Sequence, residues 1–250
     1  MEPVYSSVIR FAMGVFRAQG LRFTRTGSEH IPRTGGAVIA MNHISYMDFA
    51  YAGYPAKDVG RLVRFMAKKE VFDHRVSGPL MRGMKHIPVD RAAGADAYRE
   101  AVAALRRGEL VGVFPEATIS RSFELKEFKS GAVRMAKEAG VPVVPMILWG
   151  SQRVWTKDHP KRLGRTRVPI VIHTGAPIQV AADADVERTT ARLHEVMEGM
   201  LHEVQDAYEP MSGDDLVYLP ARLGGAAPTP ERAKELDQAE LEERRRSKAV

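Results

Sequence analysis

His43 and Asp48 have the types and the spacing of a catalytic pair. They lie five residues apart in a polar segment that directly follows an apolar run, residues 36–41. The run predicts a short buried strand, and Asn42 and Ser45 favour a turn followed by a helix. In a tight turn, Asp48 can accept a hydrogen bond from one imidazole nitrogen, which fixes the tautomer and leaves the other nitrogen as a general base. We therefore predict that the pair lies at a strand end, where loops carry chemistry.

Two further apolar runs end in charged or hydroxyl side chains. The polar residues at these ends are Asp90 and Arg91 after the first run, and Glu116, Thr118, Ser120, Arg121 and Ser122 after the second. Because the carboxyl ends of parallel strands meet at one edge of a sheet, we expect these groups near His43. A base beside two arginines suits a substrate with both a hydroxyl and a phosphate. Singly, each arginine could be a solvated surface charge and His43 could cap a helix or lie in a core, but three such strand ends together favour a site.

Strand-like runs alternate with helical segments along most of the chain. The predicted strands are residues 21–26, 36–41, 62–67, 87–91, 110–114, 143–148 and 169–174, and the predicted helices are residues 3–19, 46–54, 92–107, 131–139 and 183–208, with a helical turn at 76–84. This alternation predicts an α/β fold, a mostly parallel central sheet flanked by helices. The expected divisions are an N-terminal amphipathic segment (1–26), an α/β domain (27–219) and a charged tail (220–250). The tail cannot bury a core by itself and is either flexible or a solvated helix.

The N-terminal helix is predicted to have a wide apolar face. Its apolar side chains form two rows, Tyr5, Ile9, Ala12 and Phe16 in one and Val4, Val8, Phe11 and Val15 in the other. Arg10 and Arg17 lie on the narrow polar face. Such a helix either packs onto the core or lies in a membrane interface with its arginines at lipid phosphates. We expect the second arrangement, with a phospholipid surface as a partner.

Composition limits the class of protein and of partner. The chain has 250 residues, enough for a sizeable core, and no cysteine, which excludes disulfides, thiol nucleophiles and thiolate metal sites. The net charge of +6 favours an anionic partner, namely nucleic acid, a phospholipid surface or a phosphorylated substrate. No apolar run is long enough to predict a spanning helix, and no signal peptide is evident at the start. No histidine and acid cluster has metal-ligand spacing, so we expect no metal.

Four sequence blocks occur in an order that is typical of one enzyme family. They are Asn42-His43-x-x-x-x-Asp48, Ile87-x-Val89-Asp90-Arg91, Phe114-Pro115-Glu116 and Val141-Pro142-Val143-Val144-Pro145, with Phe128-Lys129-Ser130-Gly131-Ala132 between the last two. This set resembles the glycerolipid acyltransferase family, typified by bacterial 1-acylglycerol-3-phosphate acyltransferases. The resemblance implies that His43 takes the proton of an acceptor hydroxyl, which attacks the thioester of acyl-coenzyme A or acyl-carrier protein, and that Asp48 orients His43. It implies no cofactor besides this donor substrate.

The resemblance also implies roles for other residues of these blocks. Arg91 is expected to bind the acceptor phosphate, and Glu116 and Thr118 to contact the acceptor. Asn42 is expected to be a motif residue beside the base, and Pro142 and Pro145 to shape the wall near the acyl channel. These residues are predictions about the site.

The third block departs from the family pattern Phe-Pro-Glu-Gly-Thr-Arg-Ser. Ala117 replaces the glycine, a small change unless the position needs a positive φ. Ile119 replaces the arginine, which removes a phosphate contact. We expect Arg121 to substitute for it, with help from Lys129.

The function that we expect is acyl transfer to lysophosphatidic acid, giving phosphatidic acid, by a peripheral enzyme on the cytoplasmic face of the membrane. A second interpretation keeps the chemistry and changes the acceptor to another lysophospholipid or a glycolipid, which Ile119 favours. A nucleic-acid-binding protein would explain the charge, but the basic residues lack interleaved aromatics, so we expect no nucleic acid partner. A serine hydrolase is disfavoured because no Gly-x-Ser-x-Gly elbow is present.

Overall fold

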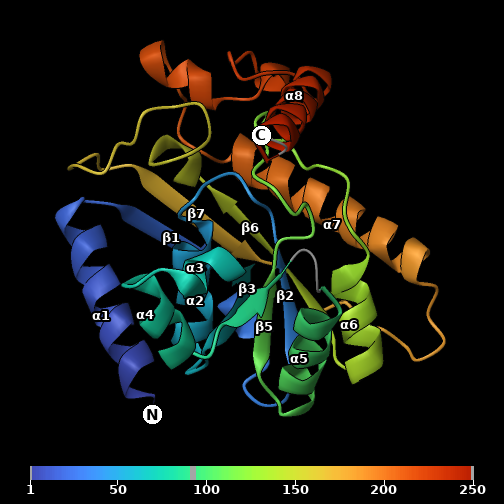
Figure 1. The fold of residues 1–250 in the computed structure, drawn as a ribbon. Coiled ribbons are helices and arrows are strands. Elements are labelled where there is room, and N and C mark those ends of the chain that lie inside the picture. Colours follow the sequence, from blue (N-terminus) through green and yellow to red (C-terminus); the bar gives the residue numbers. More distant parts are fainter. Residues whose placement is uncertain (1, 91–93, 249–250) are drawn as a thin grey trace.

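A seven-stranded sheet forms the centre of the structure, a computed structural model that describes residues 2–90 and 94–248 (Figure 1). The strands are β1 (Arg22–Thr26), β2 (Ala37–Met41), β3 (Val63–Lys68), β4 (Ile87–Val89), β5 (Leu110–Val113), β6 (Val143–Trp149) and β7 (Pro169–Thr174). They lie in the order β1-β7-β6-β2-β5-β3-β4. The five strands from β6 to β4 are parallel, β7 is antiparallel to β6, and β1 is parallel to β7. The predicted α/β fold with a mostly parallel sheet is confirmed.

Helices cover both faces of this sheet. They are α1 (Pro3–Ala18), α2 (Asp48–Asp58), α3 (Lys69–Asp73), α4 (Ser77–Gly83), α5 (Gly94–Arg106), α6 (Gly131–Ala139), α7 (Val186–Asp206) and α8 (Pro230–Lys248). Helices α5, α6 and α7 pack on one face, and α1 and α2 pack on the other. The short pair α3 and α4 connects β3 to β4, and α4 lies beside α1 (Figure 1).

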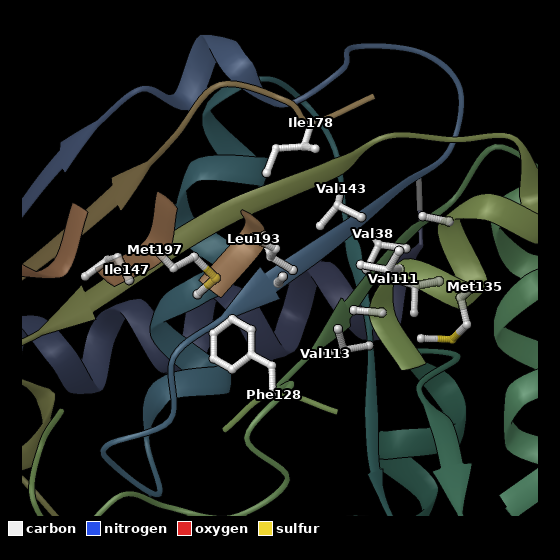
Figure 2. Packing of buried hydrophobic residues seen from close by; sticks show 14 of the residues in the cluster. Val38, Val111, Val113, Phe128, Met135, Val143, Ile147, Ile178, Leu193 and Met197 are labelled. Carbon is white, nitrogen blue, oxygen red and sulfur yellow. The ribbon is translucent and has the colours of Figure 1, made fainter. Parts of the chain in front are cut away.

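The larger core lies between the sheet and the layer of α5, α6 and α7. Figure 2 shows Val38, Val111 and Val143, from three neighbouring strands, in one cluster with Leu193 and Met197 of α7. All five side chains are buried. Strands covered on both faces need apolar residues throughout, which explains why these segments read as unbroken apolar runs in the sequence.

Strand β2 contributes to both cores. Val38 and Ala40 face the cluster under α5, α6 and α7, whereas Ala37, Ile39 and Met41 face the cluster under α1 and α2. Every residue of β2 is fully buried. The strand that leads to His43 is therefore fixed from both sides of the sheet.

The two apolar rows of α1 have different surroundings. Tyr5 and Phe16, from the first row, are buried in the cores. In the second row, Phe11 is 75% exposed, and Val4 and Val15 are also exposed. The helix thus packs against the domain with its first row and with Val8, and presents most of the second row to the outside.

Some boundaries differ from the sequence predictions. Residues 22–26, assigned with the N-terminal segment, form β1 and belong to the sheet. Helix α3 was not expected, because its five residues are too few to show a helical period. In the charged tail, residues 230–248 form α8. In the two ranges that the structure describes, no helix has the length and apolar character that crossing a bilayer requires.

Candidate active site

The ends of three adjacent parallel strands meet at one edge of the sheet. Strand β2 lies between β5 and β6 and is parallel to both. The turns that follow these three strands contain His43, Glu116 and Ser151. Hydrogen bonds link all three turns, so the residues converge at the edge where open α/β sheets bind ligands.

His43 and Asp48 form the expected contact. Nδ1 of His43 lies 3.0 Å from Oδ2 of Asp48. Because an ionised carboxylate only accepts hydrogen bonds, Nδ1 carries a hydrogen and its N–H group donates a hydrogen bond to Asp48. The unprotonated Nε2 is then available to accept a proton. The histidine side chain keeps 20% of its surface exposed, so a substrate can reach it.

Asp48 is fully buried and both of its oxygens accept hydrogen bonds. Its Oδ2 accepts the backbone N–H groups of Ile44 and Ser45, both at 2.8 Å, in addition to His43. Its Oδ1 accepts the hydroxyl of Ser151 at 2.6 Å. These donors compensate the carboxylate for its lost hydration. They also allow it only one orientation, so the imidazole is held in a single tautomer and direction.

The third-block turn holds the other side of His43. The imidazole stacks on the ring of Phe114, with 4.1 Å between ring centroids and 23° between planes. The backbone N–H of His43 donates to Oε1 of Glu116 at 2.7 Å, and its carbonyl accepts the backbone N–H of Ser120 at 2.7 Å. The backbone and the ring of His43 are therefore both positioned by residues that follow β5.

Glu116 points into the protein. It is buried, and its second oxygen, Oε2, accepts the backbone N–H of Lys126 at 3.1 Å. Burial raises the pKa of Glu116 to about 8, although the hydrogen bonds from the backbone of His43 and Lys126 act in the opposite direction. Both oxygens are engaged by the protein backbone, so this side chain supports the loop that carries His43.

The two departures from the family pattern have clear structural settings. Ala117 has a φ of +61°, the left-handed conformation that favours glycine. The family's glycine therefore suits this turn, and the alanine is accommodated at some cost. Ile119 is buried, with 3% of its surface exposed. An apolar side chain thus replaces the arginine inside the protein.

Asn42 attaches the start of the catalytic turn to the sheet. Its Nδ2 donates to the carbonyl of Leu148 at 2.9 Å, and its Oδ1 accepts the N–H of Leu148 at 2.7 Å. The amide side chain thereby makes the pair of hydrogen bonds that the backbone of a neighbouring strand residue would make. Pro142 precedes β6 at the opposite edge of the sheet from His43, and Pro145 lies inside β6 beside Ala40.

The expected substrate-binding cations lie in different environments. Arg91 falls outside the described residues. Lys129 is exposed, and its backbone N–H donates to the carbonyl of Pro115. Thr118 accepts a hydrogen bond from Nζ of Lys126 at 2.6 Å. Arg121 is bound by three carboxylates, from Asp158, Asp237 and Glu240.

Sequence reasoning missed Ser151, Thr156 and the tail carboxylates. The hydroxyl of Thr156 donates to the carbonyl of Ile44 at 2.7 Å and closes the third side of the catalytic turn. Ser151 could have been found, because Gly150-Ser151 follows a buried strand as the other two polar turns do. Gly150 has a φ of +89°, and a Cβ there would lie 2.1 Å from the carbonyl oxygen of Pro169. No comparable signal marked the tail.

The described residues contain no group of three or more histidine and acidic side chains that could hold a metal ion. The arrangement can remove a proton from a hydroxyl through the Nε2 of His43, with Asp48 stabilising the imidazolium that results. Comparisons with known proteins identify the family. The family model described as Acyltransferase matches residues 22–149, half of the chain. The chain belongs to the Acyltransferase family.

Named relatives of this acyltransferase chain include plant and bacterial proteins. A 1-acyl-sn-glycerol-3-phosphate acyltransferase of Limnanthes douglasii is 35% identical over 144 residues, 55% of this chain and 49% of that protein. A protein of the same name from Bacillus subtilis (strain 168) is 34% identical over 126 residues, 49% of this chain and 60% of that protein. The chain spans about half the length of the curated relatives it matches. The resemblance seen in the four blocks is confirmed.

A solved structure has the same fold as this acyltransferase. It is the 1-acyl-sn-glycerophosphate (LPA) acyltransferase PlsC from Thermotoga maritima, with a TM-score of 0.67 over 82% of this chain and 81% of that chain. The two sequences are 22% identical in this comparison, so the likeness concerns the fold.

Proposed function

We propose that this acyltransferase transfers a fatty acyl group from acyl-coenzyme A or acyl-carrier protein to the hydroxyl of lysophosphatidic acid, giving phosphatidic acid. The observation that carries the proposal is the hydrogen bond between Nδ1 of His43 and the buried Asp48, which leaves Nε2 as an accessible base. The activity named for the plant and bacterial relatives supports the choice of acceptor.

The proposed reaction is a general-base-assisted acyl transfer. Nε2 of His43 takes the proton of the acceptor hydroxyl as the oxygen attacks the thioester carbonyl. The tetrahedral intermediate then breaks the carbon–sulfur bond, and the departing thiolate recovers the proton from the imidazolium. The ester oxygen of the product comes from the acceptor and the free thiol from the donor. Asp48 stays ionised and orients the ring throughout.

A different acceptor with the same chemistry is the second candidate. The observation that favours it is Ile119, which is buried and apolar where the family pattern has an arginine. Arg121, expected to substitute for it, is engaged by carboxylates. Another lysophospholipid or a glycolipid would need fewer phosphate contacts than lysophosphatidic acid.

An acceptor panel tests the proposal. Purified protein is given radiolabelled palmitoyl-coenzyme A, or palmitoyl-acyl-carrier protein in a parallel series, with lysophosphatidic acid, lysophosphatidylcholine, lysophosphatidylglycerol, a glycolipid or no acceptor. We expect labelled phosphatidic acid as the main product and none with His43→Ala. Transfer to another acceptor at a higher kcat/KM would favour the second candidate, and no transfer from either donor would refute both.

The proposed place of work is the cytoplasmic face of a membrane, reached by peripheral association. The exposed row of α1 supports this, together with exposed apolar side chains on the neighbouring α3–α4 connection. These residues are Val4, Phe11 and Val15 on α1, and Val71, Val76 and Leu80 on the connection. Val4 packs at Gly83 of α4, where an added Cβ would lie 2.7 Å from it, so both elements belong to one surface. Arg10 and Arg17 on α1 are also exposed and can meet anionic head groups.

A surface variant tests this membrane contact better than a deletion, because Tyr5 and Phe16 of α1 belong to the cores. We expect Phe11→Asp/Val15→Asp to lower binding to phosphatidylglycerol-containing vesicles at least about tenfold, since two apolar anchors are replaced by charges that anionic lipids repel. Ala239→Asp/Leu241→Asp, at two exposed residues of α8, which lies away from α1 in Figure 1, adds the same charge and is the matched control. Equal binding of all three proteins in a sedimentation assay would place the membrane contact elsewhere.

A further inference from the structure

Helix α8 is attached to the domain mainly through charged side chains. Among its described residues, Ala233 is the apolar side chain that is buried, whereas Leu241 is exposed. Asp237 and Glu240, one turn apart, point toward the domain and make five ion pairs with three cations there. In Figure 1, α8 lies at the top of the molecule, away from α1. In ion pairs of this kind, another anion can take the place of the carboxylate.

The three cations are Arg121, Lys126 and Lys157. Arg121 contacts Asp237 and lies 2.9 Å from Glu240. Lys126 contacts Asp237, and Lys157 lies 3.1 Å from Glu240 and 3.5 Å from Asp237. We name Arg121, Lys126 and Lys157 the cation triad.

The cation triad borders the catalytic turn. Arg121 follows Ser120, whose N–H donates to the carbonyl of His43. The backbone N–H of Lys126 donates to Glu116, the residue that holds the N–H of His43. The third cation, Lys157, follows a threonine whose hydroxyl donates to the carbonyl of Ile44. All three cations therefore stand on loops that hold the His43 turn by direct hydrogen bonds.

One carboxylate of α8, that of Glu240, also influences the catalytic turn itself. Burial raises the pKa of Tyr46, within that turn, and the charges of Glu240 and Asp158 raise it further. Burial would raise the pKa of Glu240, but hydrogen bonds from Arg121 and Lys157 outweigh it and lower the pKa to about 2. Glu240 is therefore ionised at neutral pH.

The charge balance shows what the cation triad requires. With α8 docked, the side chains of Arg121 and Lys157 are only 8% and 13% exposed, so carboxylates rather than solvent satisfy them in this arrangement. Of the three carboxylates around them, Asp158 comes from the domain and the other two from α8. When α8 is displaced, two positive charges lack a partner beside the catalytic base. A phosphate offers two charges and several acceptor oxygens to one guanidinium and two ammonium groups.

We propose that the cation triad is a phosphate-binding site beside His43, and that Asp237 and Glu240 of α8 occupy it as carboxylate substitutes in the free protein. The inference rests on the proposed function for the source of the phosphate, the head group of the acceptor or the coenzyme A of the donor. A phosphorylated substrate displaces α8, so the helix competes with its own enzyme's ligand.

Neutralising the two α8 carboxylates tests the competition. Asp237→Asn/Glu240→Gln in the full chain should tighten the binding of inorganic phosphate and of short-chain lysophosphatidic acid, measured by calorimetry, about fivefold, and lower the apparent KM of the phosphorylated substrate to match. Glu242→Gln/Glu243→Gln removes the same charge from the exposed part of α8 and is the matched control. Adding Arg121→Ala to Asp237→Asn/Glu240→Gln should abolish the gain.

The ligands of the binding experiment identify the phosphate. If Asp237→Asn/Glu240→Gln binds lysophosphatidic acid more tightly but not monoacylglycerol, which lacks the phosphate, the site belongs to the acceptor. If the variant binds only coenzyme A more tightly, the site belongs to the donor. Equal or weaker phosphate binding by Asp237→Asn/Glu240→Gln overturns the inference and means that α8 is a structural brace. Binding is measured without transfer, so a protein that binds phosphate as expected but acylates no acceptor refutes the proposed function alone.

Discussion

Asp48 and Arg121 are both buried, ionisable and fully partnered, but their partners lie at very different distances along the chain. Three of the four groups that bind Asp48 belong to residues 43–45. Arg121 is bound by Asp158, Asp237 and Glu240, the last of them 119 residues away. Groups of the adjoining turn, two of them backbone N–H groups, satisfy most of the first side chain, and carboxylates of remote segments satisfy the second.

This difference separates a fixed part of the site from an exchangeable one. Three of the donors around Asp48 belong to the turn after β2 itself, and the full burial of Asp48 shields these contacts from salt. Two of the three partners of Arg121 are in place only when α8 docks, and the partner side chains are partly open to solvent. We expect the chemistry to depend on the first region and the access of anionic ligands to depend on the second.

The largest expected effect comes from the base itself. His43→Ala should lower kcat by about 10² to 10⁴-fold, the usual contribution of a general base. The fold should survive, because His43 is partly exposed and its backbone contacts with Glu116 and Ser120 remain. The measurements are acyl transfer and thermal unfolding of both proteins. A loss of less than about fivefold would contradict the general-base assignment.

Asp48→Asn should have the second-largest effect on kcat. Its amide nitrogen cannot accept hydrogen bonds, so either the backbone donors or the hydroxyl of Ser151 lose their acceptor, and the histidine tautomer is no longer fixed. We expect kcat to fall about a hundredfold or more, together with a lower melting temperature. Ser151→Ala removes one donor and should have a much smaller effect on kcat. If both variants reduced activity equally, the orientation of the carboxylate would not be the critical factor.

Glu116 should make stability depend on pH. Its pKa in the folded protein is raised to about 8 from an ordinary value of 4.5, so the folded state binds a proton that the unfolded state has lost. The free energy of unfolding should therefore fall as the pH rises from about 4.5 to 8, by at most about 1.4 kcal/mol per pH unit from this group. Glu116→Gln should flatten that slope in urea unfolding series, although the variant is less stable overall. An unchanged slope would show that other groups cause it.

High salt should weaken the docking of α8 but not the contacts of Asp48, a smaller effect than those of the substitutions above. At about 1 M salt the screening length is near 3 Å, so the ion pairs of Asp237 and Glu240 should weaken while the contacts of Asp48 persist. We expect limited trypsin digestion to cut within residues 230–248 several times faster than at low salt, with residues 36–58 still protected. Cleavage of a peptide substrate corrects for any effect of salt on trypsin. Equal cutting of α8 at both salt concentrations would mean that its docking is not ionic.

The smallest effect is expected at Ala117. Its positive φ costs an alanine about 1–2 kcal/mol, and glycine avoids that cost but loses about 0.4–1 kcal/mol through greater freedom of the unfolded chain. Ala117→Gly should therefore raise the free energy of unfolding by up to about 1.6 kcal/mol, with little change in kcat. Chemical denaturation measures the difference. Marked destabilisation would show that the Ala117 methyl group itself contributes to packing.

The sequence by itself determined the local parts of this protein. Strand β2, its polar turn and the return of Asp48 to His43 all lie within residues 37–48, so periodicity, turn formers and spacing were sufficient to predict them. The same holds for the strand before Glu116 and for helix α1. Each depends on contacts between residues near one another in the chain, and the identities of those residues report them directly.

The tertiary structure determined the features that depend on contacts between residues far apart in the chain. The two rows of α1 are equally apolar in sequence, and only packing against the sheet buries Phe16 and leaves Phe11 exposed. In the sequence Glu116 is a carboxylate after a strand, and only the fold brings the backbone N–H groups of His43 and Lys126 to its oxygens. The tail reads as a solvated charged segment, yet Asp237 and Glu240 meet three cations more than 75 residues away. Charged side chains carry no mark of their distant partners, because any cation of suitable reach satisfies a carboxylate, and only the fold selects which one does.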